Sequence, residues 1–193
     1  MSSKGIQLIV GLGNPGAEYE HTRHNAGVWF IQDIAHRFHA TLRYESKFLG
    51  FHALVDINGC KIHLLFPTTY MNHSGQSVKL LANYYKILPA NILVAHDEID
   101  LPVASIRLKF DGGDGGHNGL KDIMRHLNSK QFYRLRIGIG RPLHSAEVHD
   151  YVLSPPKKTE LIEIQESLVA VESILSLLIA GEFAKAMQKL HSA

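Results

Sequence analysis

Short apolar runs alternate along the chain with stretches in which apolar residues recur every three or four positions. A run of about four to eight apolar or alternating residues that ends at turn-forming residues predicts a strand. Apolar residues with helical spacing predict a helix packed on a core. These patterns predict strands at 6–10, 50–57, 61–66, 92–95, 105–110 and 133–139, and helices at 25–40, 74–86, 117–127, 159–180 and 182–191.

The order of these elements predicts the fold class. Strands and helices alternate, which is typical of α/β proteins. Segments 50–57 and 61–66 flank an Asn-Gly pair, the preferred two-residue hairpin turn, so these two strands should be antiparallel. We therefore expect a single α/β domain over residues 1–193, with a mixed twisted β-sheet flanked by helices. The C-terminal helices, at about 159–191, should pack on that sheet.

Composition agrees with a globular protein rather than a secreted or membrane protein. The 193 residues are 45% hydrophobic and 20% charged, enough to form a core without disulfides. Cys60 is the single cysteine, which excludes an intrachain disulfide and fits a reducing compartment. The first residues lack the shape of a signal peptide, and no apolar segment approaches the ~20 residues that span a bilayer. We expect a cytoplasmic protein with no membrane contact.

The charge balance limits how the chain can bind nucleic acid. Its formal net charge is only +2. A protein that wraps a duplex usually shows a larger basic excess, so the sequence permits a local basic patch but not a uniformly basic surface.

Polar residues gather in four segments that mostly follow predicted strands. In an α/β fold, ligands bind outside the carboxyl ends of strands, so these segments are expected to converge on one crevice. The segments are 11–16 with the His24-Asn25 pair beyond it, 69–72, 96–98 and 111–119.

Two of these residues suggest acid–base chemistry. His24 has an ordinary pKa of about 6.5, suited to a general base, although a single histidine is also common on a surface or at a helix cap. Asp97 could orient that histidine, or it could simply close a strand. His96 and Glu98 alternate away from Asp97 on an extended chain, so we interpret both as scaffold.

The glycine-rich segment 111–119 and three asparagines suit a substrate site. Backbone N–H groups in such a loop can approach an anion closely, although the segment could also be a flexible linker. Amide side chains offer a donor and an acceptor that never titrate. The asparagines are Asn14, Asn72 and Asn118, each of which could also be a turn residue.

Other kinds of site fit less well. The G-x-G-x-x-G spacing at 11–16 suggests a dinucleotide, but Pro15 and a helix delayed to residue 25 spoil the required context. No G-x-S-x-G nucleophile motif is present. A zinc site could draw on four residues that match no common ligand spacing: His21, His24, Asp97 and His117. We therefore expect neither a metal nor a cofactor.

Taken together, the chain resembles the bacterial-type peptidyl-tRNA hydrolases, strongly over 8–152 and only in general character beyond. Five stretches carry the resemblance in the family's order and spacing. They are LIVGLGNPGAEYEHTRHNAG at 8–27, TYMNHSGQSV at 69–78, HDEIDLP at 96–102, GGDGGHNGLKDI at 112–123 and YRLRIGIGRP at 133–142.

The resemblance implies hydrolysis of the ester bond between peptide and tRNA, without metal or cofactor. Peptidyl-tRNA would be the partner, and we expect a monomer that needs no other protein. A non-catalytic RNA-binding protein on the same fold is the rival hypothesis. The implied roles are His24 as base and Asp97 as its support, with substrate contacts from Asn14, Tyr19, Asn72 and Asn118.

The resemblance also implies that Lys109 and Arg136 clamp the 5′-phosphate of the tRNA. Both stand on the expected solvent faces of alternating strands. Two departures from the family pattern stand out. Asp114 lies in the glycine segment and is assigned no catalytic role, and Val103-Ala104 replaces the usual glycine-containing turn.

Overall fold

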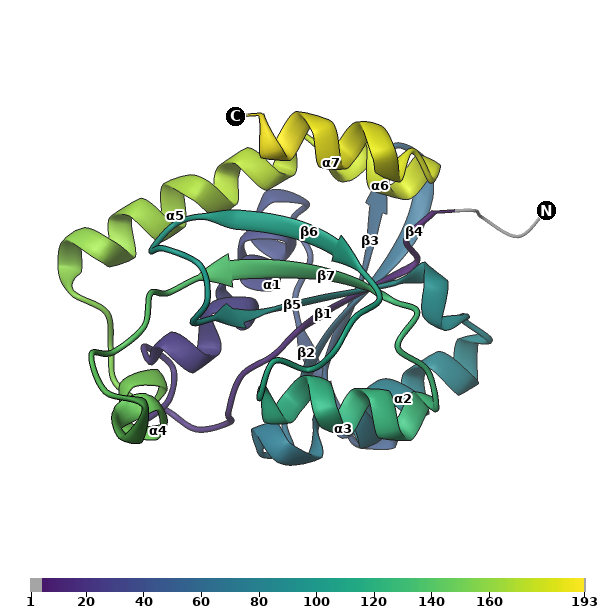
Figure 1. Ribbon diagram of the computed structural model, residues 1–193. Coiled ribbons are helices and arrows are strands. Elements are labelled where there is room, and N and C mark those ends of the chain that lie inside the picture. Colours follow the sequence, from purple (N-terminus) through teal and green to yellow (C-terminus); the bar gives the residue numbers. More distant parts are fainter. Residues whose placement is uncertain (1–4, 193) are drawn as a thin grey trace.

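A twisted sheet forms the centre of the computed structural model, which describes residues 5–192 (Figure 1). Over those residues seven strands lie in the order β2-β3-β4-β1-β5-β7-β6. Strands β4, β1, β5 and β7 are parallel to one another. Strands β2, β3 and β6 pair with their neighbours in antiparallel fashion. The strands are β1 (Leu8–Gly11), β2 (Arg43–Glu45), β3 (Gly50–Ile57), β4 (Cys60–Pro67), β5 (Ile92–Glu98), β6 (Ile106–Phe110) and β7 (Tyr133–Gly138).

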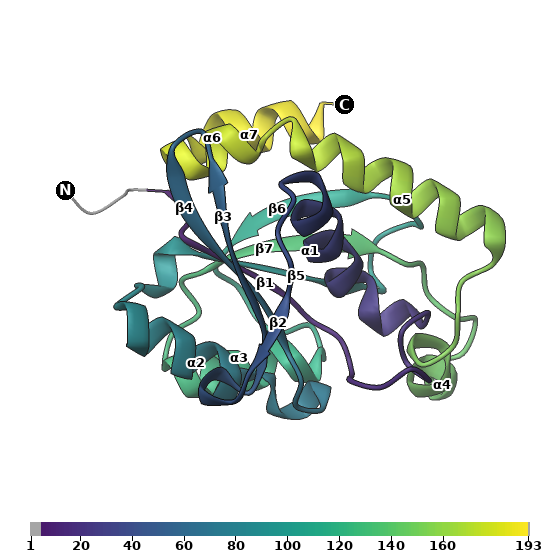
Figure 2. The same cartoon turned by 180° about the vertical axis from the view of Figure 1, so that it is seen from behind.

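Helices cover both faces of the sheet and enclose two separate cores. The larger core joins one face to α1, α5, α6 and α7, and the smaller joins the other face to α2 and α3 (Figures 1 and 2). The helices are α1 (Ala26–Arg37), α2 (Ser74–Tyr85), α3 (Asn118–Leu127), α4 (Val148–Val152), α5 (Lys158–Glu172), α6 (Leu175–Ala180) and α7 (Phe183–His191). Among the described residues, no helix is both long enough and apolar enough to cross a bilayer.

The structure confirms the mixed α/β sheet and the Asn-Gly hairpin, and it differs from the predicted elements in three places. Strand β2 was not predicted because it is a three-residue edge strand with two exposed residues. The helix predicted at 159–180 is divided into α5 and α6. There the N–H groups of Ser173 and Ile174 donate to carbonyls three residues earlier, so the chain is wound more tightly than in an α-helix. Helix α4 was missed because its five residues are too few for a clear period.

Two glycines in the first motif serve packing between α1 and the sheet. A Cβ atom at Gly27 would lie 2.1 Å from the carbonyl oxygen of Ala95, and one at Gly11 would lie 2.4 Å from that of Gly27. Only glycine permits so close an approach. This contact holds the short 3₁₀ segment Arg23–Asn25, just before α1, against the end of β5. Gly11 and Gly27 therefore permit close packing of α1 on the sheet.

The turn that lacks the family's glycine contains a strained residue. Ala104 has φ of 65°, in the left-handed region that costs a non-glycine residue about 1–2 kcal/mol. We expect Ala104→Gly to raise the free energy of unfolding by roughly 0.5–1 kcal/mol, since added unfolded-state entropy offsets part of the relief. Urea unfolding measures the change. The same substitution in a helix, Ala170→Gly in α5, should lower stability by about 1 kcal/mol. An Ala104→Gly protein no more stable than wild type would contradict the strain.

Candidate active site

The four polar segments converge, as predicted, on one cavity at the carboxyl ends of β1, β4 and β5. Its volume is about 580 Å³. The strand order changes direction around β1, which is where α/β sheets form ligand crevices. The lining residues include Asn14, Tyr19 and His24 after β1, Tyr70–His73 after β4, Asp97–Ile99, Asp114, Gly116–Asn118, and Val148, His149, Val152 and Leu153 around α4.

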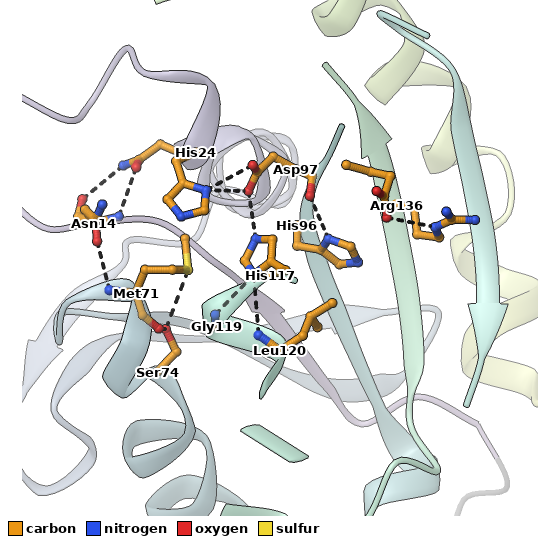
Figure 3. A network of polar contacts seen from close by, with 12 residues as sticks. Asn14, His24, Met71, Ser74, His96, Asp97, His117, Gly119, Leu120 and Arg136 are labelled. Atoms are coloured by element: carbon orange, nitrogen blue, oxygen red, sulfur yellow. Dashed lines mark hydrogen bonds and ion pairs between the residues drawn. The ribbon is translucent and has the colours of Figure 1, made fainter. Parts of the chain in front are cut away.

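A buried carboxylate holds two histidines in this cavity (Figure 3). Nδ1 of His24 lies 2.9 and 3.0 Å from the two carboxylate oxygens of Asp97. Nε2 of His117 lies 2.8 Å from Oδ1 of the same carboxylate. The Asp97 side chain is 2% exposed, whereas that of His24 is 13% exposed and lines the cavity. Asp97 therefore orients His24, which reaches the substrate space.

Backbone contacts determine which nitrogen of each ring carries a proton. His117 caps α3, and its Nδ1 accepts hydrogen bonds from the N–H groups of Gly119 and Leu120 at 3.2 and 3.4 Å. Its Nε2 must therefore carry the proton donated to Asp97. His24 likewise donates from Nδ1, because the ionised carboxylate only accepts. This leaves Nε2 of His24 as an available base.

The charges of this cluster favour that assignment. Burial disfavours the ionised carboxylate, yet His24 and His117 outweigh burial and hold the pKa of Asp97 well below its ordinary value. Burial also opposes protonation of His24, but the charge and hydrogen bond of Asp97 are stronger and raise its pKa above 6.5. A base whose conjugate acid is stabilised in this way suits proton transfer near neutral pH.

The predicted substrate-binding residues all line the same cavity. The Asn14 side-chain oxygen accepts from the Met71 N–H at 2.8 Å, which leaves the amide NH₂ of Asn14 for a ligand. The side chains of Asn72, Asn118 and Tyr19 form no hydrogen bond with any residue in 5–192, and both asparagines are exposed. The site thus combines one fixed amide with polar groups that remain free.

Lys109 and Arg136 lie together in a neighbouring cavity of about 250 Å³. The expectation that both occupy a solvent face is wrong for Arg136, whose side chain is 25% exposed and donates from Nε to Glu98 at 3.1 Å. The glycine segment folds over this face of the sheet, where buried Arg134 donates to the carbonyls of Gly112 and Gly113. That segment is therefore anchored rather than a free linker.

The proposed zinc ligands are only partly brought together. His24, Asp97 and His117 offer ligand atoms within 4.8 Å of one another, which is close enough for a metal ion. His21 is exposed and does not belong to this group. Nδ1 of His24 and Nε2 of His117 are already used in hydrogen bonds to Asp97. The same three residues therefore form a complete hydrogen-bonded set without a metal.

Sequence reasoning missed two parts of the site. His117 was considered only as a zinc ligand, although its position before a predicted helix was a signal for a cap. The wall formed by α4 was also missed. Its five residues include three apolar ones, Val148, Tyr151 and Val152, which are too few to predict a helix by their spacing.

The fold and this histidine–carboxylate site define an α/β protein of the hydrolase class. Comparison with known proteins identifies the family: residues 8–193 match the family model for peptidyl-tRNA hydrolase. The chain belongs to the peptidyl-tRNA hydrolase family.

Solved structures of that family closely resemble this chain. A peptidyl-tRNA hydrolase from Acinetobacter baumannii is 45% identical, with 98% of this chain and 96% of the other covered and a TM-score of 0.94. A peptidyl-tRNA hydrolase in complex with N-propanol is 44% identical at the same coverage, with a TM-score of 0.95. An arginine-to-glutamine mutant of the Acinetobacter enzyme gives the same identity, coverage and TM-score as the N-propanol complex.

Proposed function

We propose that this protein hydrolyses the ester bond of peptidyl-tRNA and releases the peptide and a reusable tRNA. The observation that carries the proposal is the pairing of His24 with buried Asp97 at the edge of the large cavity. Family membership supports the substrate class. The same observation favours an enzyme over the rival RNA-binding protein, because RNA binding alone needs no oriented general base.

In the proposed reaction, Nε2 of His24 removes a proton from water as the water oxygen attacks the ester carbonyl. The negative charge of Asp97 stabilises the imidazolium that forms. The tetrahedral intermediate then expels the ribose oxygen of the tRNA, which takes the proton back from His24. A carboxylic acid and a tRNA hydroxyl result, and His24 returns to its neutral state.

Amide groups in the cavity would stabilise the oxyanion of that intermediate. Asn14 is preorganised, because its side-chain oxygen accepts from the Met71 N–H and its NH₂ has no hydrogen-bond partner within the described part of the chain. Asn72 and Asn118 line the same space and are available to bind the peptide and the attacking water. Loss of one oxyanion donor typically lowers kcat by about 10²–10³-fold.

A steady-state hydrolysis assay on N-acyl-aminoacyl-tRNA tests the proposed function directly. We expect multiple turnovers, at a rate that EDTA leaves unchanged, because the histidine–carboxylate pair needs no metal to activate water. Intact substrate must be verified after incubation with EDTA alone. Binding without turnover would support the rival RNA-binding protein. A strict requirement for added zinc or magnesium would overturn the metal-free mechanism and point to His24, Asp97 and His117 as ligands.

Lys109 and Arg136 form the proposed clamp for the tRNA 5′-phosphate. Lys109 is exposed and has no ion-pair partner among residues 5–192. Arg136 uses only its Nε on Glu98, so its terminal nitrogens remain available for an anion. A phosphate contact of this kind carries no base information and suits a substrate class that includes every tRNA.

We expect Arg136→Ala to raise KM about tenfold, because the variant loses one charged contact to the phosphate. The slope of the logarithm of affinity against the logarithm of salt concentration should become shallower by about one. Paired substrates with a 5′-phosphate or a 5′-hydroxyl measure the effect, and the variant should lose the KM preference. Lys61→Ala is a matched control, since Lys61 is an exposed cation paired with Asp56 in the β3–β4 hairpin. An Arg136→Ala enzyme that keeps the wild-type KM preference would rule out the clamp.

A further inference from the structure

The cavity that contains Lys109 and Arg136, here called the clamp cavity, has a wall that the clamp does not explain. His96 on β5 lines it and pairs in register with Arg136 on β7. This histidine is 1% exposed. The alternation of residues 96–98 predicts only a scaffold role for His96, yet burial of an imidazole costs free energy unless both ring nitrogens have hydrogen-bond partners.

Only one nitrogen of His96 has a hydrogen-bond partner among residues 5–192. Nδ1 lies 2.8 Å from the main-chain oxygen of Asp97, which can only accept, so Nδ1 carries the proton. Burial, together with His117, lowers the pKa of His96 to about 3, so the ring is neutral at physiological pH. Nε2 is therefore a hydrogen-bond acceptor. It is buried and has no partner among the described residues, and it belongs to a residue that lines the clamp cavity.

The same ring also touches the catalytic centre. Its plane packs edge-on against His117, with ring centroids 5.1 Å apart. Its Nδ1–H holds the main chain of Asp97, the residue that orients His24. Figure 3 shows His96 lying between His117 and Arg136. One rigid side chain thus connects the clamp cavity to the histidine–carboxylate cluster.

We propose that His96 is a positioning residue through which an anion bound in the clamp cavity improves the alignment of Asp97 and His117. The proposal rests on the proposed function, since the anion would be the 5′-phosphate of the same substrate. A phosphate held by Lys109 and Arg136 brings an ordered donor next to Nε2. That donor is a water molecule on the phosphate, or the phosphate's own proton, because two acceptors cannot bond directly.

The new hydrogen bond satisfies a buried acceptor and fixes the plane of the ring. The ring then holds the Asp97 main chain and the face of His117 in one arrangement. Binding energy at the phosphate is in this way used at the reacting centre, so the phosphate should raise kcat in addition to lowering KM. A clamp acting alone would lower KM only.

Two near-isosteric variants separate this coupling from simple support. Asparagine places its amide near the position of Nδ1, so His96→Asn can keep the bond to Asp97 but loses the group that faces the clamp cavity. Glutamine places its amide near the position of Nε2, so His96→Gln keeps the cavity contact and loses the bond to Asp97. Each variant is assayed on peptidyl-tRNA with a 5′-phosphate and with a 5′-hydroxyl.

For wild type we expect the 5′-phosphate to raise kcat about tenfold, the typical worth of one hydrogen bond to a buried group. In both variants this kcat ratio should fall towards one, while the KM preference persists because Lys109 and Arg136 are intact. A purely structural histidine would lower kcat on both substrates equally and leave the ratio unchanged. That result, or a wild-type kcat ratio of one, would overturn the proposal.

A measurement on unmodified protein avoids any folding defect of the variants. Inorganic phosphate titrated into the wild-type enzyme should shift the ¹⁵N resonance of His96 Nε2, and Lys109→Ala should abolish the shift. An Nε2 resonance unaffected by saturating phosphate would refute the contact. If wild type hydrolyses neither substrate, the proposed function fails, and the phosphate titration still decides whether His96 senses the anion.

Discussion

Replacing His24 with alanine should lower kcat for peptidyl-tRNA hydrolysis by about 10²–10⁴-fold and leave KM within a few-fold of wild type. The reason is geometric: His24 borders the large cavity and uses only Nδ1 on Asp97, whereas both ring nitrogens of His117 are already hydrogen-bonded. Without its Nε2, water must attack as a neutral nucleophile. Single-turnover kinetics with saturating enzyme would isolate the chemical step from substrate binding.

His21→Ala is the matched control for this experiment. His21 is an exposed histidine on the same loop and forms no part of the cluster, so its loss should leave kcat unchanged. As the pH is lowered, the kcat/KM of wild type should also begin to decrease at a pH above the ordinary histidine pKa, because Asp97 raises the pKa of His24. A His24→Ala enzyme that retains half its activity would disprove the assignment of the base.

The sequence predicted the sheet class and the convergence of the polar segments because both follow from local patterns. Apolar runs and the Asn-Gly turn fix strands and a hairpin, and strand ends meet at one edge of a parallel sheet. The pairing of His24 with Asp97 was one of two open interpretations of Asp97 until the family resemblance favoured it, since 73 positions separate the two residues. No local pattern encodes a contact across that distance.

The features that sequence reasoning missed depend on tertiary packing. Arg136 was expected on a solvent face because β7 alternates, but the glycine segment folds over that face and half-buries it. His117 was weighed as a metal ligand because its sequence neighbours do not show that its Nδ1 caps α3. The free nitrogen of His96 appears only when every contact of a buried residue is known.

Replacing Asp97 with asparagine should lower kcat by about 10³–10⁴-fold, the effect of presenting a base in the wrong tautomer. Both His24 and His117 donate a proton to the carboxylate. Asparagine has one acceptor oxygen and one NH₂ group, so it can satisfy only one of them. His117 cannot change tautomer, because the N–H groups of Gly119 and Leu120 occupy its other nitrogen.

The asparagine oxygen should therefore face His117, and its NH₂ should face Nδ1 of His24. His24 then carries its proton on Nε2 instead of Nδ1. A protonated Nε2 cannot accept a proton from water, so His24 no longer acts as a base. We therefore expect the double variant Asp97→Asn/His117→Ala to be more active than Asp97→Asn. With His117 removed, the amide can turn its oxygen to His24 and restore the productive tautomer.

The recovery should be about tenfold, the worth of one correctly made hydrogen bond, and it should stay incomplete because the negative charge is still missing. Without that charge, burial alone acts on His24 and lowers its pKa, so the acid limb of kcat/KM should move to lower pH. His117→Ala by itself is the control and should be less active than wild type. If the double variant is no more active than Asp97→Asn, the competition between the two histidines for one acceptor is not what limits the single variant.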